Sequence, residues 1–119
     1  MAKVLVVDDD EVICGILRAL LESKGHQVIE ASSGSSAVDM ARSEKPDLII
    51  LDMNMPDMTG WETIPVIPSH PDTKNTPIVA LTADSTADGH EEAHLAGCDR
   101  YVTKPFDDAR LFAALDGLL

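Results

Sequence analysis

Five short apolar runs are spread along the chain, and each is short enough to be a β-strand. They are Val4–Val7, Val28–Ala31, Leu48–Leu51, Ile78–Leu81 and Tyr101–Val102. None alternates cleanly between apolar and polar residues, and most are rich in Val and Ile. This pattern is typical of strands that are covered on both faces, as in a parallel sheet.

Segments with helical periodicity lie between these runs. In the first, apolar residues recur at i, i+4 spacing and predict one broad apolar stripe on a helix that ends near Gly25. These residues are Val12, Ile13, Ile16, Leu17, Leu20 and Leu21. A weaker segment before Pro46 contains Ala37, Val38, Met40 and Ala41. The last follows Asp107, its expected N-cap, and its apolar residues are Leu111, Phe112, Leu115 and Leu118.

The order is therefore β-α five times over, which predicts one α/β domain spanning residues 1–119. Right-handed crossovers in such a chain give a doubly wound parallel sheet of five strands with helices on both faces. Two helices are less clear. Pro65 and Pro68 fall in the third and should shorten or distort it. The fourth, from Thr86 to Ala96, has Gly89 and few bulky apolar residues, so we expect it to be loosely held.

Polar residues follow directly where the strong strands end. Val4–Val7 is followed by Asp8 and Asp9, Leu48–Leu51 by Asp52, Ile78–Leu81 by Thr82, and the last strand by Lys104. The carboxyl ends of parallel strands share one edge of the sheet, and ligands bind there. We therefore expect carboxylates, a hydroxyl and an ammonium group to gather at this edge.

This set of groups suits phosphoryl chemistry. Clustered carboxylates repel one another unless a cation lies among them, and oxygen ligands favour Mg²⁺. Lys104 and Thr82 could contact phosphoryl oxygens, while a carboxylate can attack phosphorus to give an acyl phosphate. The prediction is a divalent cation next to a phosphoryl-accepting aspartate, Asp52.

The series Asp8-Asp9, Asp52, Thr82-Ala83 and Lys104-Pro105 resembles, in order and spacing, the receiver domain of two-component response regulators, including the chemotaxis regulators. The resemblance covers the whole chain and rests on several separated motifs. It implies the flavodoxin-like strand order 2-1-3-4-5 and a switch that is phosphorylated by a histidine kinase or phosphotransfer protein. The resemblance also implies a phosphoacceptor rather than an enzyme acting on other substrates, one that would catalyse only its own phosphorylation and dephosphorylation.

The resemblance also implies a role for each matching residue. Asp52 would be the phosphoacceptor, contacted through its phosphoryl group by Thr82 and Lys104. Mg²⁺ or Mn²⁺ would be bound by the carboxylates of Asp8, Asp9 and Asp52, with Asp8 acting through water, and by the backbone carbonyl of Asn54. Tyr101 falls at the aromatic switch position. A cis peptide at Lys104-Pro105 and a downstream partner on the fourth helix, fifth strand and fifth helix are further implications.

The net charge excludes some classes of binding partner, and the cysteine content indicates the cellular compartment. The formal charge of −12 argues against binding to nucleic acid or to an anionic membrane. Two cysteines, Cys14 and Cys98, form no CxxC motif, and no apolar stretch is long enough for a signal peptide or a membrane span. We expect a reduced, cytoplasmic protein.

Four alternatives were weighed against this interpretation. Asp8 to Val12 matches the DxDx[TV] motif of haloacid dehalogenase-type phosphatases, with Asp8 as nucleophile, but this leaves Asp52 without a role. His90 to His94 matches the zinc motif HExxH but lacks a third ligand. Asp52 to Thr63 resembles a calcium loop with Asp57 in place of the required glycine. A pseudo-receiver acting only as an interaction module would not need the acceptor set intact.

Overall fold

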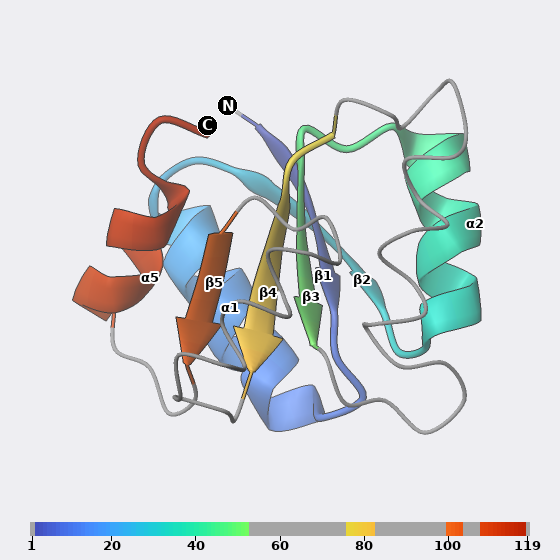
Figure 1. Ribbon diagram of the computed structural model, residues 1–119, viewed down its shortest axis with the longest axis horizontal. Coiled ribbons are helices and arrows are strands. Elements are labelled where there is room, and N and C mark those ends of the chain that lie inside the picture. The colour runs from blue at the N-terminus through green and yellow to red at the C-terminus, as the bar shows by residue number, and fades with distance from the viewer. Residues whose placement is uncertain (1, 53–75, 83–99, 104–107, 119) are drawn as a thin grey trace.

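The computed structural model describes residues 2–52, 76–82, 100–103 and 108–118 (Figure 1). Its strands form one parallel sheet in the order β2-β1-β3-β4-β5. The strands are β1 (Lys3–Val7), β2 (Gln27–Ala31), β3 (Leu48–Asp52), β4 (Ile78–Thr82) and β5 (Arg100–Thr103). The helices are α1 (Glu11–Ser23), α2 (Gly34–Glu44) and α5 (Asp108–Leu115). The predicted α/β class with a parallel sheet is confirmed.

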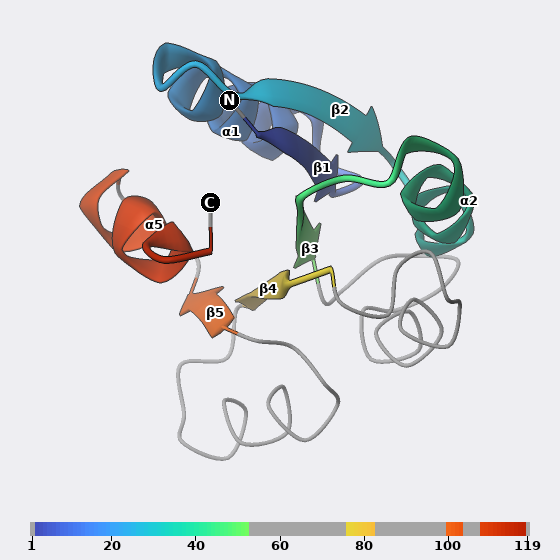
Figure 2. The same ribbon diagram turned by 90° about the horizontal axis from the view of Figure 1, so that it is seen from above.

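Alternate residues of the central strands pack into two separate cores, one on each face of the sheet. From β1, Val4 and Val6 join the core that contains residues of α1 and α5. Leu5 and Val7 join the core that contains residues of α2. Figure 2 shows the same arrangement, with α1 and α5 on one side of the sheet and α2 on the other. Every residue of β3, and every residue of β1 after Lys3, is buried, which explains why these strands lack an alternating polar pattern.

The helix ends follow from local sequence. Asp10 caps α1, its side chain accepting a hydrogen bond from the backbone N–H of Val12 at 2.9 Å. Ser33 caps α2 in the same way through the N–H of Ser36. Gly25 follows the C-cap of α1 with φ 85°, so the predicted stop at this glycine is confirmed.

The predicted apolar stripe of α1 is partly wrong. Leu17 and Leu21 are fully buried, and Ile13 and Leu20 pack partly buried against the same core. Val12 and Ile16 instead point outward, because a single helix resting on a sheet cannot bury a stripe this broad.

Several predictions fall outside the described residues. These are the third helix with Pro65 and Pro68, the fourth from Thr86 to Ala96, and the peptide bond between Lys104 and Pro105. The predicted N-cap Asp107 lies there as well; the described part of the last helix, α5, buries Leu111 and Leu115. None of the described helices is both long and apolar enough to cross a membrane.

Candidate functional site

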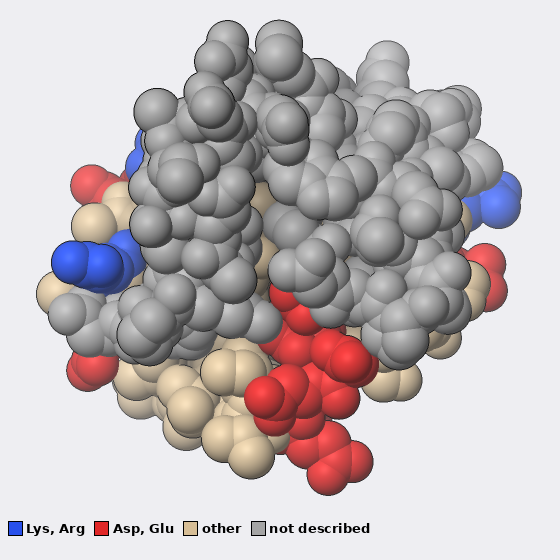
Figure 3. All heavy atoms as spheres, turned by 60° about the horizontal axis from the view of Figure 1, so that its bottom comes forward, with Lys and Arg blue, Asp and Glu red and all other residues tan. Residues whose placement is uncertain are grey.

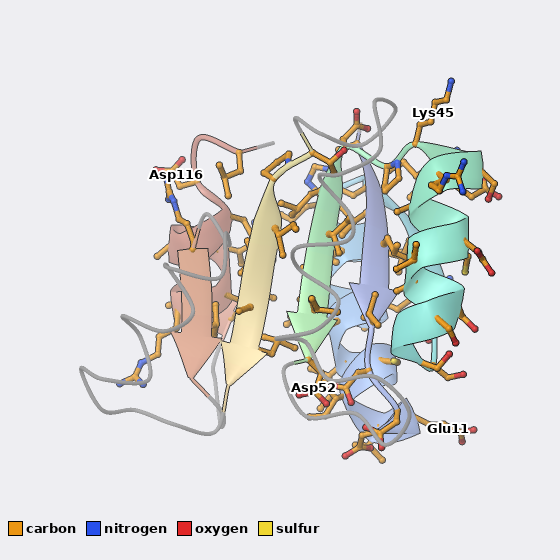
Figure 4. The ribbon with its side chains drawn as sticks, turned by 45° about the vertical axis from the view of Figure 1, so that its right-hand side comes forward. Glu11, Lys45, Asp52 and Asp116 are labelled. Carbon is orange, nitrogen blue, oxygen red and sulfur yellow. The ribbon has the colours of Figure 1, made fainter. Side chains whose placement is uncertain are left out.

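The register of two neighbouring strands brings Asp8 and Asp52 together. β1 and β3 are parallel, and Val7 at the end of β1 is the partner of Leu51. The next residue along each strand direction is Asp8 on one and Asp52 on the other, so the two carboxylates emerge side by side. Figure 4 shows Asp52 at the carboxyl end of β3, near the start of α1.

Asp9 completes a three-carboxylate cluster. One carboxylate oxygen from each of Asp8, Asp9 and Asp52 lies within 4.8 Å of the other two. Asp8 is only 2% exposed and Asp52 only 4%, while Asp9 is exposed. Figure 3 shows acidic side chains gathered at this edge of the molecule, which is the lower edge in Figure 1. Two carboxylates of the cluster are thus buried, and the third is accessible to solvent.

Asp8 is held in place by hydrogen bonds. The backbone N–H of Asp8 donates to the carbonyl of Ala31 on β2 at 3.2 Å. Its Oδ1 accepts from the backbone N–H of Asp10 at 2.9 Å, and its carbonyl accepts from the Cys14 thiol at 3.4 Å. Nothing in the local sequence indicates the Cys14 contact, because it depends on how α1 crosses the end of β1. The two backbone bonds fix the main chain at Asp8, and the bond from the Asp10 N–H orients its carboxylate.

Cys14 itself is a poor nucleophile. It is 5% exposed, and burial, followed by the charges of Asp8 and Glu30, raises the pKa of its thiol to about 11. The thiol therefore stays protonated near neutral pH and acts as a small apolar group and weak donor.

Of the remaining predicted site residues, Thr82 and Tyr101 are located by their positions in β4 and β5. Asp52 pairs with Leu81, so Thr82 lies one residue beyond it on the neighbouring strand. Thr82 in turn pairs with Thr103, and Lys104 comes next in the chain. Tyr101 lies in β5 opposite Ala80. Lys104 and Asn54 themselves lie outside the described residues.

The donor set fits a divalent cation. Three carboxylates within 4.8 Å of one another, two of them buried, repel strongly in the low dielectric of a protein edge. A hard cation would offset this repulsion, and oxygen donors with room for water are what Mg²⁺ prefers. Asp8, Asp9 and Asp52 are the described residues that could hold it.

Comparison with known proteins agrees with this geometry. The family model of the response regulator receiver domain matches residues 4–116. The chain belongs to this family. Receiver domains are phosphorylated on an aspartate and act as switches in two-component signalling.

Individual relatives match over nearly the full length of the receiver domain. The polar-differentiation response regulator DivK of Brucella ovis is 30% identical, over 98% of this chain and 95% of its own. The chemotaxis response regulator CheY4 of Vibrio cholerae is 34% identical with a TM-score of 0.94, over 100% of this chain and 99% of its own. The phosphatase alternative, which needs a different fold, is therefore set aside.

One solved relative carries the expected metal. The receiver domain of the sensor histidine kinase PA1611 from Pseudomonas aeruginosa has a magnesium ion coordinated in its active-site cleft. It is 31% identical with a TM-score of 0.87, and the match covers 96% of this chain and 93% of that one. Binding of Mg²⁺ at an acidic site is a property of receiver domains.

Proposed function

We propose that Asp52 is the phosphoacceptor of this receiver domain. The observation that carries the proposal is the pairing of burial and charge at the strand ends. Asp52 is 4% exposed at the end of β3, and Asp8 and Asp9 offer oxygens within 4.8 Å of its own. Asp8 occupies the matching position after β1, but its carboxylate accepts a hydrogen bond from the N–H of Asp10, whereas Asp52 is the last residue of β3.

The reaction is a transfer of one phosphoryl group to a carboxylate oxygen. An oxygen of ionised Asp52 attacks phosphorus, the P–N bond of a phosphohistidine breaks, and the leaving imidazole nitrogen takes a proton from water. Hydrolysis of the acyl phosphate later returns the carboxylate and inorganic phosphate. Thr82 and Lys104 would donate to phosphoryl oxygens. In support, Thr82 lies one residue beyond the partner of Asp52 on the neighbouring strand, and Lys104 directly follows β5 in the sequence.

We further propose that Asp8, Asp9 and Asp52 bind Mg²⁺ or Mn²⁺ together with the backbone carbonyl of Asn54. When bound, the ion supplies positive charge that offsets the phosphoryl oxygens and the three carboxylates. The hydrogen bond from the Asp10 N–H to Asp8 pre-orients one of these carboxylates before any ion arrives.

The wider role follows from the family. We propose that residues 1–119 form one receiver domain, with helices on both faces of its five-stranded sheet, and that it works in the cytoplasm. A histidine kinase or phosphotransfer protein would supply the phosphoryl group. The downstream partner would bind the face formed by the fourth helix, β5 and α5, with Tyr101 as the aromatic switch.

Labelling with acetyl phosphate and Mg²⁺ tests the acceptor. We expect intact-mass spectrometry to show one added phosphoryl group on the wild type and none on Asp52→Asn. Asp39→Asn, at an exposed position of α2, is the matched control and should label normally. EDTA should stop the reaction, because the carboxylates then repel the incoming anion.

Two results would contradict the assignment. Undiminished labelling of Asp52→Asn would move the acceptor to another residue, with Asp8 the first to test. Absence of labelling in the wild type would favour a pseudo-receiver that acts only as an interaction module.

A further inference from the structure

The peptide group between Asp8 and Asp9 is bonded to a side chain of α1. Its carbonyl, which is that of Asp8, accepts a hydrogen bond from the Cys14 thiol at 3.4 Å, and this bond is buried. A planar peptide group turns as one unit, so a bond to its carbonyl also fixes the direction in which the main chain enters Asp9. The thiol therefore acts on two of the three carboxylates in the cluster at once.

The two carboxylates depend on the thiol bond to different degrees. Asp8 is only 2% exposed, and its carboxylate has a second support, the hydrogen bond from the Asp10 N–H at 2.9 Å. Asp9 is exposed, so its placement follows mainly from the main chain that carries it. Loss of the thiol bond should therefore disturb the position of the Asp9 carboxylate relative to that of Asp8.

Cys14 is held firmly enough to act as a fixed donor. It lies in the first turn of α1, and its backbone N–H donates to the carbonyl of Asp10 at 3.1 Å. Its side chain is 5% exposed and belongs to the core that also contains Leu17 and Leu21. A donor that is attached both to a helix and to the core holds its partner more precisely than a donor on a loop.

Packing alone does not explain the direction of the bond. A buried cysteine commonly serves as a small apolar side chain, and a polar side chain inside a helix can bond to the carbonyl one turn earlier. For Cys14 that carbonyl belongs to Asp10, yet the thiol donates to Asp8, which lies outside the helix. The bond joins the helix to the carboxylate cluster rather than to its own preceding turn.

We propose that Cys14 is a positioning residue for the metal site, and that its thiol fixes the peptide group between Asp8 and Asp9 so that both carboxylates can bind one Mg²⁺. This inference rests on the proposed function, because it takes the two aspartates as metal ligands. It adds a residue that acts through both ligands at once. Hydrogen-bond partners of metal ligands contribute about 10–100-fold to metal affinity, and a thiol, as a weak donor, belongs at the low end.

Cys14→Ala and Cys14→Ser form a matched pair for the test. Alanine and serine have nearly the same volume, and both are neutral, so the two variants differ in the hydroxyl donor and not in size or charge. We expect calorimetric titration to show a dissociation constant for Mg²⁺ about tenfold higher in Cys14→Ala than in the wild type. In Cys14→Ser the hydroxyl can donate to the same carbonyl, so the constant should stay within about threefold of the wild type.

Stability should rank the two variants in the opposite order. Serine is less favourable in a helix than alanine, and it adds a buried hydroxyl, so Cys14→Ser should have the lower midpoint of urea unfolding in EDTA. If Cys14 only filled space, the less stable variant would not bind Mg²⁺ more tightly. If Cys14→Ser does not fold, Cys14→Thr against Cys14→Val gives the same comparison of a hydroxyl with a group of similar size.

Leu21→Val is the control for a general loss of stability. Leu21 is fully buried in the same core at the other end of α1. Its variant should lower the midpoint of unfolding, because it removes buried apolar volume, and should leave the dissociation constant for Mg²⁺ unchanged.

Labelling by acetyl phosphate over a range of Mg²⁺ concentrations gives a second measurement. Cys14→Ala should need about tenfold more Mg²⁺ to reach half of its maximal rate, since its defect lies in metal affinity. Equal dissociation constants for Cys14→Ala and the wild type would overturn the proposal, and so would an equal loss in Cys14→Ala and Cys14→Ser. If Mg²⁺ binds in the expected order but Asp52 is not labelled in the wild type, the phosphoacceptor function fails and the positioning role stands. Absence of Mg²⁺ binding by the wild type would refute the metal site and the positioning role with it.

Discussion

Cys14 places a buried thiol next to the carboxylate cluster. The thiol donates to the carbonyl of Asp8 at 3.4 Å, and its pKa is raised to about 11, first by burial and then by the charge of Asp8. The folded state therefore binds this proton more tightly than the unfolded chain, whose thiol has a pKa near 9.0. The stabilisation is fully present below about pH 9 and is lost as the pH rises toward 11.

This loss of stability with rising pH gives a prediction for Cys14→Ala. The wild type should lose about 2–3 kcal/mol of this contribution between pH 8 and pH 11, because two pKa units correspond to about that free energy. Cys14→Ala has no such proton, so the difference in the free energy of unfolding between the two proteins should shrink as the pH rises. Urea unfolding measures this difference. EDTA is added so that no bound divalent cation offsets the charge of Asp8. A difference that stays constant over this range would show that the thiol ionises as freely in the fold as outside it.

At the scale of elements, the start of α1 joins helix stability to site geometry. The Asp10 side chain accepts from the N–H of Val12, and the Asp10 N–H donates to the carboxylate of Asp8. One residue thus caps the helix and orients a candidate metal ligand.

Removing the cap should therefore affect both properties. We expect Asp10→Ala to lower the free energy of unfolding by about 1 kcal/mol, since the first-turn N–H groups lose their acceptor. The freed turn should also weaken Mg²⁺ binding, which calorimetric titration would detect. Asp10→Ser keeps a capping oxygen and should restore most of the stability, whereas Asp39→Ala on α2 controls for the loss of an exposed charge. Equal stability of Asp10→Ala and wild type would mean that water replaces the cap.

The same helix shows how an element can serve two surfaces. α1 gives Leu17 and Leu21 to the core and leaves Val12 and Ile16 outside. The apolar pattern of a helix therefore does not by itself show which residues are buried, because the crossing of the helix over the strands decides which face meets the sheet.

At the scale of the whole molecule, the sheet links the proposed acceptor, Asp52 on β3, to β5 through β4. Asp52 pairs across to β4, where Thr82 ends the strand, and β4 pairs with β5, which contains Tyr101. A phosphoryl group on Asp52 would draw Thr82 toward it and vacate space that Tyr101 could fill. Phosphorylation would then shift a balance between two existing states rather than create a new one.

Amide NMR with a beryllofluoride mimic of the phosphoryl group tests this coupling. We expect large chemical-shift changes from Thr82 to Ala96 and at Tyr101. In Thr82→Ala the changes at Tyr101 should shrink, while Mg²⁺ binding persists because Thr82 is not a metal ligand. Changes confined to the residues next to Asn54 in the sequence would show that the signal does not travel through β4 and β5.

The sequence by itself determined which segments become strands and which residues end them. Val- and Ile-rich runs without polar alternation can be stable only inside a covered sheet, so the α/β class followed from pattern alone. Asp8, Asp9 and Asp52 could be predicted as a group because parallel strands place their carboxyl ends at one edge. The end of α1 at Gly25 followed from the left-handed conformation that glycine allows.

Only the tertiary structure decided distances, burial and faces. The pairing of Val7 with Leu51 sets Asp8 beside Asp52, and no local pattern specifies that register. The contact of Cys14 with Asp8, and the exposure of Val12 and Ile16, depend on the angle at which α1 crosses the sheet. Local sequence fixes which conformation each segment prefers, whereas the packing of elements far apart in the chain determines which side chains meet, because that packing minimises the apolar surface of the whole molecule rather than of one element.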